Sequence, residues 1–493
     1  MAGEDDLPDG ELPRREISYL PSVSFLNVLP SRQNFVWEGS HSPIGSGLYS
    51  FERVASDKRI SPLLLPEKAP YGDDLDELLL PYSQEASLHE SDALSTPQAV
   101  FNLVNTVVGV GVLSVPYAFR MSGYLTLVLL LLVISVTSLT GKYIGRSLRL
   151  VAENCLSPAV PPRARDYTFL AHTAFGSKGR SFIQVVTSLE LWFVVVTFMI
   201  MHGGNVVVLW PDLDRSPVIV FSCILSACMV FLPMKVFAVV SAVSSTALFI
   251  AGVAMVGAAL KLDGWAKPCE SLGSSMELHV WNMPRAAGIL VFCFAGHPCF
   301  PIVYECMKDK RTWSKSVDLT FFIAFLYYGS LGVFGYFVFG KTVHASYTED
   351  ELGIPAAAFW RDVSILAFST KLILTAPLLF NAVLVSWWAP GEREWPPLRV
   401  LTLAALAAAT ALTAVFFSKD VAVIASLTGS LFVMITSVLF PTLIHLVLSR
   451  RCHKWLHPCI FAQHCLVLFF GAVFTVVGTF FAVTDMLGWS TAA

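Results

Sequence analysis

Three ionisable side chains interrupt long apolar stretches of the sequence: Glu190, His297 and Lys371. If these stretches cross a bilayer, a charge at its centre costs at least ~2.5–3.5 kcal/mol, so each group must be paired, hydrated or neutral. An imidazole can also titrate near neutral pH. The sequence therefore predicts three polar positions, structural or functional, within otherwise apolar segments.

His297 lies between Cys293 and Cys299, a grouping that raises the question of a metal site. No closed set of four ligands accompanies it, so we expect no metal and no other cofactor. His297 is expected instead to bond a freed backbone carbonyl or to line a cavity. No nucleophile–base set, no paired carboxylates and no phosphate-binding Gly-rich loop ending in Lys-Ser/Thr occur, which argues against an enzyme and against ATP-driven pumping.

Two apolar segments contain glycine and proline at positions that disfavour a continuous helix. The first has Gly109, Gly111 and Pro116, and the sixth has Gly296 and Pro298. The two interrupted segments are separated by five positions in the order of segments, which is the spacing that an inverted repeat of five helices gives to equivalent helices. Paired broken helices of this kind are typical of a transporter binding site near the bilayer midplane. Simple kinks are the alternative, since both residues are common in membrane helices.

A broken helix exposes N–H groups at one end and carbonyls at the other, with partial positive and negative charge. A free amino acid needs such a pair of partners, one for its carboxylate and one for its ammonium group. Asn105 lies nearer the first break than Asn102, although either amide could simply join helices. The predicted contacts are Asn105, Gly109, Val110 and Gly111 from the first break and Phe294, Ala295, Gly296 and His297 from the sixth.

The composition indicates a polytopic membrane protein. Of 493 residues, 55% are hydrophobic and 14% charged, and the net charge of -3 gives no support for nucleic-acid binding. A span needs ~20 mostly apolar residues, which predicts an all-α protein with about eleven spans. They are 97–118, 123–145, 181–209, 217–232, 236–260, 285–304, 317–339, 356–388, 399–417, 421–448 and 459–486.

The charge is unevenly distributed along the chain. Residues 1–96 carry seven Lys/Arg against 17 Asp/Glu, which predicts a disordered acidic tail. Acidic residues follow Met1 where a signal peptide would have basic and then apolar residues, so we expect no cleavable signal peptide. Basic residues in the connectors number 17 on the side of this tail and eight on the other, so the N-terminus is predicted to be cytosolic. Residues 97–486 form the membrane domain, and 487–493 a short tail on the lumenal or extracellular side.

The acidic tail contains Asp74, Leu78 and Leu79 in the spacing of an acidic dileucine motif. A sorting adaptor is therefore a candidate partner. The alternative is a solvated acidic tail without a partner.

Several separated motifs resemble the amino acid/auxin permease family. They are NxxNxxxGxGxLxxPYA from Asn102 to Ala118, FxGHPxFPxxY from Phe294 to Tyr304, Glu190, the Gly204-Asn205 pair, and Lys371 with Pro377. The second motif is similar to that of the vacuolar amino acid transporters. The vesicular inhibitory amino acid transporter shares the first-helix pattern, Glu190 and Lys371 but lacks Gly-His-x-x-Phe-Pro, so we favour the vacuolar branch.

The resemblance implies two inverted five-helix repeats with interrupted first and sixth helices. It also implies a proton-coupled carrier of neutral amino acids, in which helices one, two, six and seven rock against the rest. The third and eighth helices pack together in such folds, so Glu190 and Lys371 are predicted to form an ion pair. That pair either breaks and re-forms as protons move or is a permanent salt bridge. Lys371 could instead be a fixed cation where sodium-coupled relatives place sodium.

Expected partners are the amino acid, protons and the lipid membrane, without nucleic acid. We expect a vacuolar or other endomembrane location in preference to the plasma membrane. The rival interpretation is a transporter-like sensor that binds an amino acid and signals through the cytosolic tail. A channel fits two broken helices around a compact site less well.

Overall fold

The computed structural model describes residues 93–154, 165–232, 234–259, 279–346, 358–387, 397–453 and 456–489. The tail that contains Asp74, Leu78 and Leu79 lies outside these ranges, as do residues 490–493. Within the described part, regular structure is helical apart from one isolated β-bridge between Leu94 and Met307. For the described residues, the prediction of an all-α fold is confirmed.

Eight helical units are long and apolar enough to cross a membrane among the described residues. They are α4 (Leu125–Glu153), α5 (Tyr167–Leu209), the interrupted unit Val280–Cys306 with α9 (Met283–Phe292) and α10 (Phe300–Cys306), α11 (Trp313–Phe339), α13 (Ala358–Trp387), α14 (Pro397–Phe416), the unit Val421–Arg451 with α15 (Val421–Leu427) and α16 (Phe440–Arg451), and α17 (Pro458–Met486).

A ninth span is formed if α2 (Thr96–Val107) and the helical segment Gly111–Ser122, which includes α3 (Val115–Ser122), count as one unit bent by 48°. Two further apolar helices are shorter: α6 (Arg215–Met229) and Val243–Gly257 within α7 (Met234–Ala259). Eleven spans require that both of these also cross, so the full count and the inverted repeats stay predictions.

The helix α5 begins earlier than residue 181, the predicted start of the third span. Asp166 caps α5, because its carboxylate accepts a hydrogen bond from the N–H of Phe169 at 2.7 Å. Gly176 then turns the chain at φ 71°, so a separate first part of α5 precedes the membrane-crossing part. Hydropathy alone misses this first part because it is more polar than the helix that follows.

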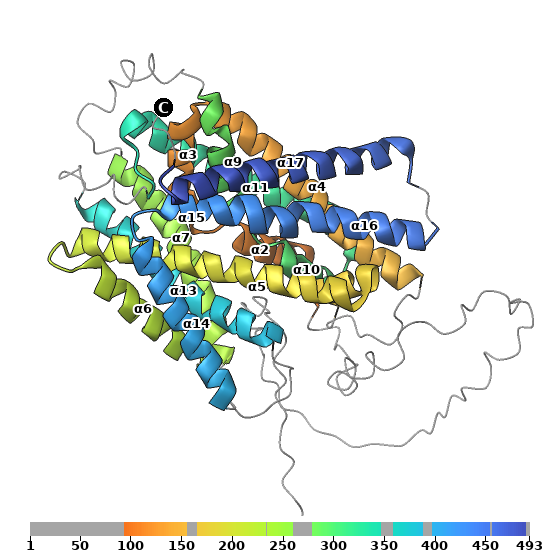
Figure 1. Ribbon diagram of the computed structural model, residues 1–493, viewed down its shortest axis with the longest axis horizontal. Helices are drawn as coiled ribbons and strands as arrows, with labels where there is room; N and C mark the ends of the chain where they lie inside the picture. The colour runs from red at the N-terminus through yellow and green to blue at the C-terminus, as the bar shows by residue number, and fades with distance from the viewer. Residues whose placement is uncertain are drawn as a thin grey trace, which may run out of the picture.

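The helices pack in two groups, one of which contains α5. Figure 1 shows α6, α13 and α14 together below α5, and α4, α11, α16 and α17 above it. Contacts agree: α2, α3, α4, α9, α10 and α11 pack among themselves, while α5, α6, α13 and α14 pack among themselves, with α7 along α13. Each interrupted helix belongs to the first group.

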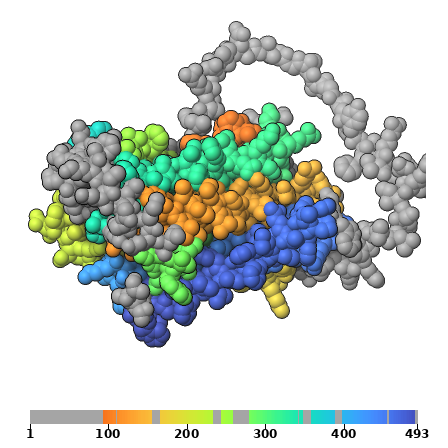
Figure 2. Space-filling view, turned by 90° about the horizontal axis from the view of Figure 1, so that it is seen from above, coloured from red at the N-terminus to blue at the C-terminus, as the bar shows by residue number. Residues whose placement is uncertain are grey.

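The outer faces of the helices are apolar. Val128, Leu131 and Leu132 of α4, with Phe322 and Leu326 of α11, are among the exposed large side chains. Figure 2 shows α4, in orange, beside α11, in blue-green, along one face of the molecule. Wide apolar surface of this kind suits lipid chains and is rare on soluble monomers.

Two glycines allow close packing of α9 against the unit Val421–Arg451, the tenth of the predicted spans. A Cβ on Gly429 would lie 1.9 Å from the carbonyl oxygen of Gly288, and one on Gly288 would lie 2.5 Å from Oγ of Ser426. Around this crossing the tenth span widens into π-helical turns at Thr428–Val433 and Ile435–Leu439. The close approach fixes α9, and with it one side of the sixth-span break.

Candidate functional site

Both predicted breaks are present. α2 ends at Val107, Gly109 is extended, and a short 3-10 helix resumes at Val110–Ser114. α9 ends at Phe292, and a 3-10 turn at His297–Cys299 leads into α10. In each break the backbone leaves the helix for a few residues, which frees N–H and carbonyl groups from the usual ladder.

The two breaks contact each other directly. A Cβ on Gly111 would lie 2.7 Å from Sγ and 3.2 Å from Cα of Cys293. A Cβ on Gly296 would lie 2.9 Å from Cγ2 of Thr106. Glycine at position 111 therefore lets the two backbones approach closely, and glycine at position 296 leaves room for the Thr106 methyl group.

Tyr328 of α11 joins the two breaks through its hydroxyl group. The hydroxyl accepts a hydrogen bond from the N–H of Gly109 at 2.8 Å. It also lies 3.0 Å from the carbonyl oxygen of Val107 and 3.1 Å from that of Cys293. The side chain is fully buried, with its ring packed edge-to-face on Phe294.

Space remains beside the first break. Apart from its chain neighbours, no described atom lies within 4 Å of the point that a Cβ on Gly109 would occupy. Within the described residues, the N–H groups of Gly111, Gly296 and His297 donate no hydrogen bond. The breaks thus offer unpaired donors beside an open position, as recognition of a carboxylate requires.

Asn105 and Phe294 are held by neighbouring helices. The side-chain oxygen of Asn105 accepts a hydrogen bond from Oγ of Ser245 on α7. Phe294 is fully buried against Phe321 and Tyr328. Ala295 is half-buried at the sixth break, and the side chain of Val110 lies outside the described part.

His297 joins the sixth break to α4. Its Nε2 lies 2.9 Å from the carbonyl oxygen of Thr137 and 3.2 Å from Oγ1 of Thr140, and its ring stacks on Phe300 at 4.6 Å. It is fully buried. These contacts make His297 an anchor for the backbone of the break. No group of three or more His, Cys, Asp or Glu side chains that could hold a metal occurs among the described residues.

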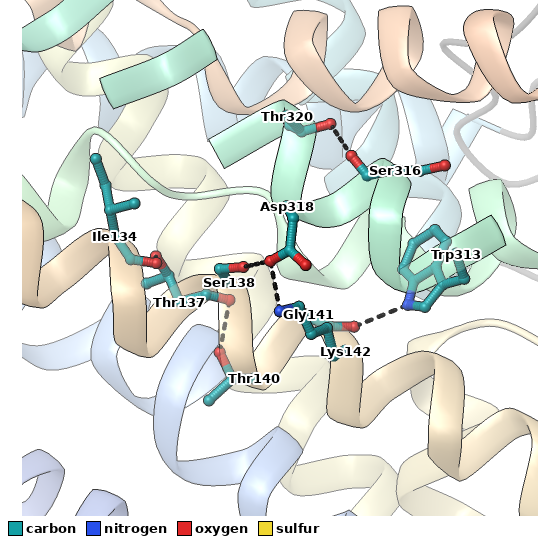
Figure 3. A network of polar contacts seen from close by, with 10 residues as sticks. All are labelled: Ile134, Thr137, Ser138, Thr140, Gly141, Lys142, Trp313, Ser316, Asp318 and Thr320. Carbon is teal, nitrogen blue, oxygen red and sulfur yellow. Dashed lines mark hydrogen bonds and ion pairs between the residues drawn. The ribbon is translucent and has the colours of Figure 1, made fainter. Parts of the chain in front are cut away.

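α4 contacts the sixth-span break through His297 and also forms polar contacts with α11. Figure 3 shows Ser138 and Lys142 of α4 turned toward Asp318 of α11, with Ser138 Oγ at 3.0 Å from the carboxylate and Lys142 in an ion pair with it. Trp313 donates to the carbonyl of Gly141 at 3.2 Å. Polar contacts therefore join α4, which bonds His297, to α11, which carries Tyr328.

Glu190 and Lys371 form no ion pair in this structure, contrary to the prediction. Glu190 is 2% exposed and accepts a hydrogen bond from Oγ1 of Thr436 at 2.7 Å, in a π-turn of the tenth span. Lys371 is 6% exposed, and in the described ranges no carboxylate lies within ion-pair distance of its ammonium group. In this conformation the carboxyl group of Glu190 is bonded to Thr436 instead, and the roles of Glu190 and Lys371 stay predictions.

The sequence profile of the family described as transmembrane amino acid transporter protein matches residues 92–484. The chain belongs to this family. The match confirms the resemblance to the amino acid/auxin permeases and covers both helix breaks, Glu190 and Lys371. The predicted non-enzymatic role is confirmed as well, because members of the family are named as transporters.

Two relatives similar in sequence agree with the family assignment, and one solved structure is reported for its likeness alone. Amino acid transporter AVT1B of Arabidopsis thaliana is 26% identical, over 95% of this chain and 88% of the relative. The vesicular inhibitory amino acid transporter of Xenopus laevis is 25% identical, over 80% of this chain and 77% of the relative. A crystal structure of the Eremococcus coleocola manganese transporter has a TM-score of 0.49 and 11% identity, covering 80% of this chain and 90% of that one.

Sequence reasoning missed two residues that the structure places at these sites. Tyr328 follows Tyr327 in an otherwise apolar helix, and a pair of phenols in such a segment is a weak signal for a buried polar contact. Thr436 carries no signal at all, since threonines usually bond the preceding turn of their own helix. Each forms a hydrogen bond with a residue far away in the sequence, Tyr328 with Gly109 and Thr436 with Glu190.

Proposed function

We propose that the chain is a secondary active transporter that moves neutral amino acids across a membrane by alternating access, coupled to protons. The observation that carries the proposal is the junction of the two helix breaks at Gly109, Gly111 and Cys293, with open space beside Gly109. The family assignment supplies the class of cargo.

The breaks have the groups that a zwitterion needs. The N–H of Gly111 stands at the start of a helical segment, where the backbone carries partial positive charge and suits a carboxylate. Cys293 directly follows the end of α9, where carbonyls carry partial negative charge and suit an ammonium group. Backbone groups alone can therefore bind the part common to all amino acids.

A neutral cargo fits the side chains around the breaks. Residues 101–119 and 286–304 contain no Asp, Glu, Lys or Arg, and their single ionisable imidazole, His297, is bonded to α4. A charged substrate side chain would have to leave water without a partner, which is costly in an apolar site. We therefore place small or apolar amino acids ahead of acidic and basic ones.

Alternating access is supported by polar contacts at the two ends of the sixth span. At one end Glu305 forms ion pairs with Lys310 and with Arg165, which lies just before α5. At the other end Arg285 of α9 forms an ion pair with Asp485 of α17. Opening either side of the site would separate contacts of this kind while the other end stays closed.

Proton coupling is assigned to Glu190 and Lys371, the ionisable pair buried in α5 and α13. The two groups have separate surroundings, so each can change its protonation state at a different step of the cycle. We place the protein in a vacuolar or other endomembrane with its N-terminus cytosolic. A sorting adaptor at Asp74, Leu78 and Leu79 is part of the same proposal.

The sensor interpretation predicts binding without flux, and one experiment separates the two. Purified full-length protein in liposomes is tested with a panel of labelled neutral amino acids under an imposed proton or sodium gradient. Uptake driven by the proton gradient supports the carrier. Saturable binding with no uptake under either gradient would overturn it in favour of the sensor.

A further inference from the structure

The hydroxyl group of Tyr328 is the one side-chain group in the described residues that contacts both helix breaks through hydrogen bonds. It contacts the N–H of Gly109 and the carbonyl of Val107 on the first break, and the carbonyl of Cys293 on the sixth. Its three partners are the kind of backbone groups that the proposed function assigns to the substrate.

A phenol has a single proton to donate. The hydroxyl accepts from Gly109, and its proton can serve either Val107 O at 3.0 Å or Cys293 O at 3.1 Å. With nearly equal distances, one of the two carbonyls lacks this hydrogen at any moment. A buried carbonyl without a donor is unfavourable by ~1–3 kcal/mol, so it favours a ligand that brings an N–H group.

We propose that Tyr328 is a positioning residue of the substrate site. Its hydroxyl sets the spacing of the two breaks and leaves one carbonyl, of Val107 or Cys293, for the ammonium group of an amino acid. The inference rests on the proposed function and adds to it a residue on α11, outside both interrupted helices. It also predicts that ligands need at least one N–H donor.

Tyr327 provides a matched control on the same helix. Its hydroxyl donates to the carbonyl of Leu248 on α7 at 3.1 Å. Tyr327→Phe therefore removes the same oxygen atom from the neighbouring position, and likewise breaks a hydrogen bond between helices, without touching either break.

The experiment measures both binding and flux for wild type, Tyr328→Phe and Tyr327→Phe. The probe is the labelled neutral amino acid that binds wild type most tightly; Kd is measured on purified protein, and KM and Vmax in liposomes. We expect Tyr328→Phe to raise Kd and KM about tenfold with a smaller change in Vmax, because the hydroxyl no longer holds the two breaks at the spacing that the ligand needs. Tyr327→Phe should leave Kd and KM within about twofold of wild type. Equal effects of the two variants would overturn the inference.

A second variant covers the case in which Tyr328→Phe does not fold. 4-Aminophenylalanine at position 328 keeps a donor at the ring and has two protons, so it can serve both carbonyls and compete with the ligand. We expect a raised Kd in a folded protein, and an unchanged Kd would contradict the shared-proton account. If the wild-type protein binds the amino acid but does not transport it, the proposed function is wrong, and the Kd values of the variants still test the role of Tyr328. Wild type that does neither would overturn both.

Discussion

At the scale of single residues, the proposed site depends on three glycines, which have no side chain beyond Cα. Gly111 and Gly296 allow two backbones to touch, whereas Gly109 borders open space. The three glycines look alike in the sequence, and only the structure distinguishes those that pack from the one that faces the proposed substrate. The distinction makes opposite predictions for the same substitution.

Gly109→Ala and Gly111→Ala form such a pair. At position 109 the new methyl group meets no described atom within 4 Å, so we expect thermal stability close to wild type and a several-fold higher KM for uptake. At position 111 it meets Cys293 Sγ at 2.7 Å and its Cα at 3.2 Å, so the breaks must move apart. Overpacking of this kind costs about 1–3 kcal/mol, which a melting curve should show. Equal melting temperatures in the two variants would refute the assigned geometry.

The role of Lys371 in proton coupling can be tested by removing its charged side chain. Because it is buried without a carboxylate partner among the described residues, Lys371→Ala should keep the fold and lose proton-driven uptake at least tenfold. Glu190→Gln is the matched variant, since a glutamine oxygen can still accept from Thr436. Uptake is measured in liposomes under a pH gradient. Full proton-driven uptake by Lys371→Ala would remove Lys371 from coupling.

At the scale of elements, the Glu305 end of the interrupted unit Val280–Cys306 joins the two helix groups through its ion pair with Arg165. Glu305 at the end of α10 has 1% of its side chain exposed between Arg165 and Lys310. Backbone hydrogen bonds from Leu94 to Cys306 and from Lys308 to Leu94 reinforce this end. The segment before α2, the end of α10 and the start of α5 are therefore joined by polar contacts.

Removing the Glu305 carboxylate leaves two cations near each other. Lys310 keeps 38% of its side chain exposed, so Glu305→Ala should cost less than the ~3–5 kcal/mol of a fully buried broken pair but should still lower the melting temperature. The control is Glu153→Ala, which removes an exposed pair with Arg149 worth about 0.3–0.5 kcal/mol. Thermal unfolding in detergent compares them. A Glu305 variant as stable as the Glu153 variant would show that this cluster does not hold the end closed.

Apolar runs and glycine–proline interruptions were sufficient to predict both broken helices and most membrane segments, because period and composition are local properties. Three features were out of reach. The first part of α5 depends on the Asp166 cap and the turn at Gly176. Glu190 meets Thr436, and Gly109 meets Tyr328, across more than two hundred residues. Such pairings follow from how helices pack, and no single segment encodes them.

At the scale of the whole molecule, the described helices form a supporting group around α5, α6, α13 and α14 and a second group that contains both breaks (Figure 1). The proposed substrate site lies on the second group, where α4 bonds His297 and α11 bonds Gly109; Figure 3 shows the contacts between α4 and α11. Motion between the groups would then carry the site from one side of the membrane to the other.

The most direct test of this account asks whether the breaks recognise both ends of a zwitterion. Uptake of a labelled neutral amino acid into liposomes is challenged with the unlabelled amino acid, its decarboxylated amine and its deaminated acid, using wild type and Gly109→Ala. We expect the intact amino acid to compete at least tenfold better than either fragment, since each fragment leaves one set of backbone groups unpaired. The advantage should shrink in Gly109→Ala. Competition by either fragment as strong as that of the amino acid would contradict a substrate site built from both breaks.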